Sequence, residues 1–185
     1  MDSSHKRGLG DLLDQHAPDI CLLERREMHD TLFSWSTTRL PGTVFTDHVD
    51  SPEVLVRDLI HEAGHHWFND ALTAASVSSP ESPSFYSPWQ KKNTIRPAFE
   101  FLHACWAFSL TAIYSAQVVD ATPSPVQGFL RDYLTDQGRH LRDALSALAD
   151  AVTLITSVPL RDQLSKAVDA ALRCTPGAVH LLPAQ

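Results

Sequence analysis

The segment that most constrains this chain is Ile60-His61-Glu62-Ala63-Gly64-His65, which contains the pattern His-Glu-x-x-His. Side chains that are four residues apart lie on the same face of a helix. The imidazoles of His61 and His65 therefore converge and can bind one metal ion, while Glu62 lies beside the ion and outside its set of ligands. The motif predicts a metal site on a helix, and it leaves the identity of the metal open.

The sequence before the motif predicts where this helix begins. Ser51 can cap the first turn, Pro52 fits the first helical position, and Glu53 complements the positive end of the helix dipole. Apolar residues then recur every four positions through the motif. We predict one helix from Pro52 to about Ala75.

Composition limits the kind of protein. A chain of 185 residues with 43% hydrophobic and 20% charged residues is expected to form one domain, residues 1–185. The net charge of -7 argues against a nucleic-acid partner. No apolar signal core follows the amino terminus, and three widely spaced cysteines suit a reducing cytoplasm. The longest uncharged run, residues 104–119, is too short and too polar to span a bilayer. We expect a cytoplasmic protein with no membrane partner.

The remaining periodicity predicts a mostly α-helical single-domain bundle. We expect helices over Ile20 to Phe33, from Pro97 to about Val119, from Leu130 to Ile155 and after Pro159, with at most a short β-hairpin or strand near 43–47. The long amphipathic stripes of the last third indicate core packing, and a homodimer seam is the alternative.

Residues 76–88 have a different composition, rich in serine and proline, which excludes a helix or a central strand. The alternatives are a disordered surface loop and an ordered lid or pocket wall. Phe85, Tyr86 and Trp89 end the run, and disordered segments are poor in aromatic residues. We therefore predict the ordered wall.

A catalytic metal needs a third protein ligand. Glu100 and His103 lie three residues apart on one face of the second long helix, and either side chain can reach an ion bound by His61 and His65. Glu100 would give two imidazoles and a carboxylate, which suits zinc hydrolysis or a non-haem iron oxygenase. His103 would give three neutral imidazoles. Spacing alone does not choose between them.

Three further segments follow the motif in order: Phe85-Tyr86-Ser87-Pro88-Trp89, then Arg96-Pro97, then Leu102-His103 at the start of an aromatic-rich helix. With the motif, this order resembles the 2-oxoglutarate-dependent HExxH-type peptide β-hydroxylases, which tailor ribosomally made peptides. The resemblance covers roughly Gly42 to Tyr114. The chain departs from the family pattern at Gln90, where an arginine is common, and at Ala104, where a glycine is common.

The resemblance implies that His61, His65 and His103 bind Fe(II), with Glu62 as an orienting neighbour. It implies that Arg96 binds the distal carboxylate of 2-oxoglutarate, because the planar guanidinium suits bidentate binding of a carboxylate. The remaining expected cofactor-binding residues are Tyr86, Ser87 and Trp89.

The function that follows from the resemblance is an Fe(II)/2-oxoglutarate-dependent oxygenase. It would oxidise an unactivated carbon of a peptide or amino-acid-like substrate, free or bound to a carrier or leader, in natural-product tailoring. The first alternative is a Zn(II) metallopeptidase that uses Glu100 as its third ligand and Glu62 as the base. The second is a helical interaction module with a structural metal.

Overall fold

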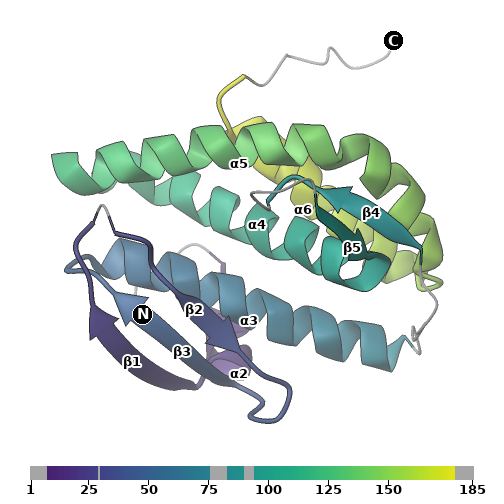
Figure 1. Ribbon diagram of the computed structural model, residues 1–185, viewed down its shortest axis with the longest axis horizontal. Helices are drawn as coiled ribbons and strands as arrows, with labels where there is room; N and C mark the ends of the chain where they lie inside the picture. The colour runs from purple at the N-terminus through teal and green to yellow at the C-terminus, as the bar shows by residue number, and fades with distance from the viewer. Residues whose placement is uncertain (1–7, 29, 76–82, 90–93, 178–185) are drawn as a thin grey trace.

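The computed structural model describes residues 8–28, 30–75, 83–89 and 94–177. The fold is mostly α-helical, as predicted (Figure 1). The described helices are α2 (Gly10–His16), α3 (Pro52–Ala74), α4 (Ala98–Val118), α5 (Ser124–Ala151) and α6 (Val158–Cys174), with short 3-10 turns at Val119–Ala121 and Val152–Leu154. The bounds of α3 and α4 agree with the predicted ones to within one residue at each end.

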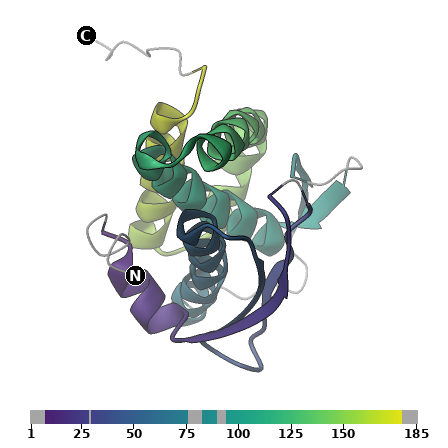
Figure 2. The same ribbon diagram turned by 90° about the vertical axis from the view of Figure 1, so that its left-hand side faces the viewer.

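A three-stranded sheet forms the amino-terminal part of the fold. It consists of β1 (Asp19–Arg25), β2 (Ser34–Ser36) and β3 (Thr43–His48), in the order β1-β3-β2. Strand β1 is parallel to β3, and β2 is antiparallel to it. Figure 2 shows this sheet curving around one side of α3, with α4, α5 and α6 on the other side. The strand predicted near 43–47 is confirmed as β3, but the sheet is larger than the hairpin that was expected.

The prediction of a helix over Ile20 to Phe33 is wrong, because its first six residues belong to β1 and none of the described residues from there to Phe33 is helical. Ile20 pairs with Val44 in β3, and Trp35 pairs with Phe45. Pairing with a strand that is distant in the sequence overrides local helical propensity, and the local sequence pattern does not predict that pairing.

Helix α3 begins as predicted and packs closely against α4. The Ser51 hydroxyl accepts a hydrogen bond from the Val54 amide at 3.4 Å, which caps the helix. Where the helices meet, a Cβ on Gly64 would lie 3.3 Å from Leu110 Cδ1 and 3.6 Å from the Cα of Ala107. The absence of a side chain inside the metal motif therefore allows α4 to approach α3.

Helix α4 is the central helix of the bundle. Together with its 3-10 turn, Ala98–Ala121 is long and apolar enough to cross a membrane by length and composition, but 78% of its most apolar window is buried inside the fold. The core helix of a soluble protein has the same properties. This burial agrees with the expected buried helix over residues 104–119.

The carboxyl-terminal helices α5 and α6 turn their apolar stripes into the core. Leu130, Leu141, Leu164 and Val168 are among the residues that are almost fully buried there. The stripes thus pack within this chain, as the sequence predicted. A second small sheet joins β4 (Ser84–Ser87) to β5 (Thr94–Pro97) in antiparallel pairing. Within the segment 76–88, residues 76–82 lie outside the described residues and Ser84–Ser87 form β4, so the lid or pocket wall stays a prediction.

A buried carboxylate joins the three strands of the first sheet. Asp47 in β3 accepts hydrogen bonds from the backbone amides of Glu24, at 3.2 Å, and Phe33, at 3.3 Å, and from Nε of Arg26 at 3.2 Å. Burial acts to raise the pKa of Asp47, but these hydrogen bonds outweigh it, and the net pKa is lowered.

The lowered pKa predicts how stability depends on pH. Because the folded-state pKa of Asp47 lies below the unfolded value, its stabilisation is present at neutral pH and is lost as the pH falls through the folded pKa. We expect Asp47→Asn to lower the free energy of unfolding at pH 7 and to flatten its decrease in acid. Urea denaturation at several pH values measures both effects. An unchanged acid slope would contradict this role of Asp47.

Candidate metal centre

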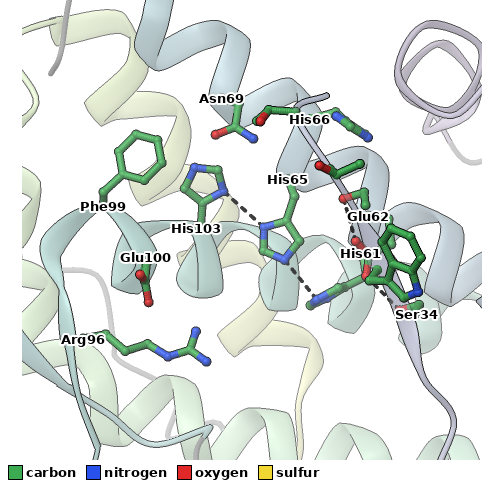
Figure 3. A pocket seen from close by; sticks show the side chains of 14 residues that line it. Ser34, His61, Glu62, His65, His66, Asn69, Arg96, Phe99, Glu100 and His103 are labelled. Carbon is green, nitrogen blue, oxygen red and sulfur yellow. Dashed lines mark hydrogen bonds between the residues drawn. The ribbon is translucent and has the colours of Figure 1, made fainter. Parts of the chain in front are cut away.

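Three imidazoles from two helices meet at one place. His61 and His65 lie on α3, and His103 lies on α4 (Figure 3). Nε2 of His65 is 3.1 Å from Nε2 of His61, and Nδ1 of His65 is 3.1 Å from Nδ1 of His103. The motif thus brings its two histidines together as the helical spacing predicts, and α4 places His103 in direct contact with the pair.

The contacts form a chain of rings with His65 in the middle. His61 and His65 turn their Nε2 atoms toward one point, but His103 approaches the opposite nitrogen of His65. Within the described residues, no group of three or more His, Cys, Asp or Glu side chains already converges as a metal site. Nε2 of His103 is buried and has no hydrogen-bond partner among the described residues. Rotation of the His103 side chain toward the Nε2 pair would therefore use an otherwise unpartnered atom.

The three imidazoles are held in the neutral form. Burial lowers the pKa of His61 to about 4, aided by the charge of Arg57. Burial also lowers the pKa values of His65 and His103, each to about 3. Metal ions bind neutral imidazole, so no proton has to be displaced at physiological pH. In its donor chemistry, this set of residues fits a divalent transition metal.

Glu62 is held in place by strand β2. Its Oε1 accepts a hydrogen bond from the Ser34 hydroxyl and its Oε2 one from the Ser36 hydroxyl, both at 2.8 Å. The carboxylate is buried. Two directed hydrogen bonds fix both oxygens, so Glu62 is oriented before any ligand arrives. Sequence analysis missed these serines, although the alternation Ser34-Trp35-Ser36 places both hydroxyls on one face of a strand.

A cavity of about 430 Å³ opens beside the imidazoles. One wall comes from β2 and the residues after it, and the opposite wall comes from β5 and the start of α4. The lining residues include His61, Glu62, His65, His66, Asn69, Arg96, Phe99, Glu100 and His103 (Figure 3). The positive charge of Arg96 acts on His65 and contributes to lowering its pKa, after burial and the charge of His61.

The predicted cofactor-binding residues divide into two groups. Arg96 lines the cavity, whereas Tyr86, Ser87 and Trp89 do not. The strand register explains the difference for Tyr86, because it pairs with Ile95, and successive side chains of a strand point to opposite faces. Tyr86 and Ile95 are exposed, whereas Ser87 is fully buried, and no described residue forms a hydrogen bond with its hydroxyl.

Trp89 packs between α4 and α5, outside the cavity. Its indole Nε1 donates a hydrogen bond to Oε1 of Gln137 on α5 at 2.8 Å. Its ring stacks on Phe108 with centroids 5.1 Å apart, and Phe108 in turn lies 4.7 Å from the ring of His61. Trp89 therefore packs against Phe108, which in turn contacts the candidate ligand His61, and it does not line the cavity. His66, the residue that follows the motif, is buried and also contributes to the cavity wall.

Comparisons with known proteins do not assign the chain to a family, since no protein-family model matches it and no curated protein matches it significantly.

Proposed function

We propose that this protein is an Fe(II)/2-oxoglutarate-dependent oxygenase that acts on a peptide or amino-acid-like substrate. The observation that carries the proposal is the contact of His103, 3.1 Å from His65, in a cavity that Arg96 also lines. Three imidazoles beside an arginine suit a metal that must also bind an anionic keto acid. The proposal includes a cytoplasmic location and no nucleic-acid or membrane partner.

In this proposal His61, His65 and His103 hold the iron. Bound together, Fe(II) and 2-oxoglutarate would let dioxygen oxidise an unactivated carbon–hydrogen bond: one oxygen atom would enter the substrate as a hydroxyl group, and the other would enter succinate as the keto acid loses carbon dioxide. Arg96 binds the distal carboxylate of 2-oxoglutarate through its planar guanidinium. The resemblance in sequence and the place of Arg96 on the cavity wall both support that role.

The residues of this chain position the reactants. Glu62 keeps a fixed orientation through Ser34 and Ser36, which suits a residue that orients a ligand or a water molecule. Phe99 borders the cavity, and its ring lies 4.5 Å from that of His103. Its apolar ring would limit the access of water to His103 from that part of the cavity wall.

A zinc metallopeptidase is the second candidate, and one observation favours it. Glu100 lines the same cavity, beside Arg96 in Figure 3. In that function Glu100 would replace His103 as third ligand and Glu62 would take a proton from water. The two candidates therefore differ in which residue of α4 binds the metal.

Anaerobic titration with Fe(II) and 2-oxoglutarate tests the proposal. We expect a weak visible charge-transfer band when the keto acid chelates the protein-bound iron through its ketone and carboxylate. Succinate in place of 2-oxoglutarate is the matched control, since it lacks the ketone and should give no band. Zn(II) in place of Fe(II) should also give none. Absence of the band at saturating protein would contradict the proposed function.

A further inference from the structure

Strand β2 has a free edge beside the cavity. The sheet order β1-β3-β2 puts β2 at one side, and within the described ranges no other strand pairs with its outer edge. An unpaired edge exposes backbone N–H and C=O groups that can accept another strand. What that edge can bind depends on which of its residues turn these groups outward.

The hydrogen bonds between β2 and β3 identify those residues. The Asp47 amide donates to the Phe33 carbonyl at 2.8 Å. In an antiparallel ladder, hydrogen-bonded pairs alternate with pairs whose backbone groups point away from the partner strand. Trp35 is therefore the β2 residue that exchanges hydrogen bonds with Phe45, and the backbone groups of Ser34 and Ser36 face the free edge.

These outward groups lie at the wall of the candidate metal centre. Ser34 and Ser36 both line the cavity, and their hydroxyls reach Glu62 at the same time. The backbone edge and the imidazoles therefore border one space. The opposite wall holds Arg96 and Phe99, so a chain lying along β2 would pass between that wall and the strand.

We infer that the free edge of β2 binds the substrate as an extended peptide strand. Donors and acceptors that recur every second residue, at Ser34 and Ser36, are complementary to a peptide backbone in a β conformation. In such a strand alternate side chains point to opposite sides, so one of them would enter the cavity while its neighbours point away. The inference rests on the proposed function for its chemistry and adds the substrate class and how that substrate is held.

Two variants of one residue separate the edge from the contact with Glu62. Ser36→Ala removes the hydroxyl and keeps the backbone N–H, whereas Ser36→Pro removes both. Proline is tolerated at outward positions of an edge strand.

The probe is a library of randomised linear peptides of about eight residues. It is added to the iron-loaded protein with 2-oxoglutarate, and the readout is peptide-stimulated succinate release. We expect the Ser36→Pro protein to release roughly tenfold less succinate than the Ser36→Ala protein, because the proline ring removes one backbone hydrogen bond to the peptide. Equal release by the two variants would overturn the inference.

A second measurement uses the unaltered protein. The same library with N-methyl groups on alternate backbone nitrogens cannot complete a β ladder, so we expect it to stimulate succinate release far less. Hydrogen exchange at the amides of Ser34 and Ser36 should slow with the unmethylated library only. If neither library slows exchange while the charge-transfer band is intact, the edge inference fails and the oxygenase proposal stands. If the band is absent, the oxygenase proposal fails, and protection of these amides still reports directly on the edge.

Discussion

Replacing His103 by phenylalanine is expected to release iron from the protein, whereas replacing Glu100 by alanine is expected to leave iron bound. His103 is buried against His65, with its Nε2 unpartnered, whereas Glu100 is exposed at the cavity wall. Loss of a group that merely supports a ligand weakens metal binding about 10–100-fold, so loss of a ligand should exceed roughly 100-fold. Anaerobic equilibrium dialysis followed by metal analysis measures the two affinities.

Phenylalanine replaces His103 because an aromatic ring preserves the packing at that position. The ring of His103 lies 4.9 Å from that of Phe68 and 4.5 Å from that of Phe99, so alanine would remove packing as well as the nitrogen atoms. Phenylalanine retains an aromatic ring and removes only the donor. Circular dichroism should show an unchanged fold. If instead Glu100→Ala loses the metal and His103→Phe keeps it, the ligand set is that of the zinc peptidase.

The part of the site that lies on α3 was predictable, because it depends on local geometry. The cap at Ser51, the proline after it and the four-residue spacing of His61 and His65 each act within one or two helical turns. The third ligand was left open for a physical reason. Both Glu100 and His103 face the same way on α4, and only the packing of α4 against α3 decides which of them touches His65.

The sheet and its contribution to the site were not predictable in the same way. The stretch from Ile20 to Phe33 was expected to be helical, but its first part forms β1, and each β1 residue from Asp19 to Leu22 pairs with a β3 residue 24 positions further along the chain, as Ile20 does with Val44. The role of Ser34 and Ser36 depends on that sheet. Without β3 to fix the register of β2, nothing in the sequence directs the two hydroxyls toward Glu62.

Only some of the residues in the segments that resemble a known family line the cavity. Arg96 and His103 both line the cavity, but Tyr86 is on the outer face of the hairpin. Sequence order shows that segments recur together, whereas the strand register decides which of their side chains face inward. The resemblance therefore supports Arg96 as a ligand-binding residue more strongly than it supports Tyr86.

A buried ion pair between neighbouring residues of α3 lies one turn before His61, and its arginine also contacts aromatic rings of α5. Nε of Arg57 donates to Oδ1 of Asp58 at 2.9 Å, and the Arg57 guanidinium lies 5.0 Å and 4.7 Å from the ring centroids of Phe129 and Tyr133. Both charged side chains are buried, and within the part of the chain that the structure describes Oδ2 of Asp58 has no hydrogen-bond partner. The core beside α3 therefore contains the Asp58 carboxylate, and among the described residues only Arg57 donates a hydrogen bond to it.

Arg57→Ala is expected to lower the free energy of unfolding by about 3–5 kcal/mol, because it leaves the Asp58 carboxylate buried without a counterion. The double variant Arg57→Ala/Asp58→Ala should be more stable than Arg57→Ala alone, since it removes the stranded charge, and urea denaturation measures both. Burial already raises the pKa of Asp58 against the opposing effect of Arg57. Without Arg57 the pKa rises further, so the loss of stability should shrink as the pH falls and Asp58 becomes protonated. A deficit below about 1 kcal/mol, or one that does not change with pH, would show that Arg57 does not stabilise the fold by compensating the buried Asp58 carboxylate.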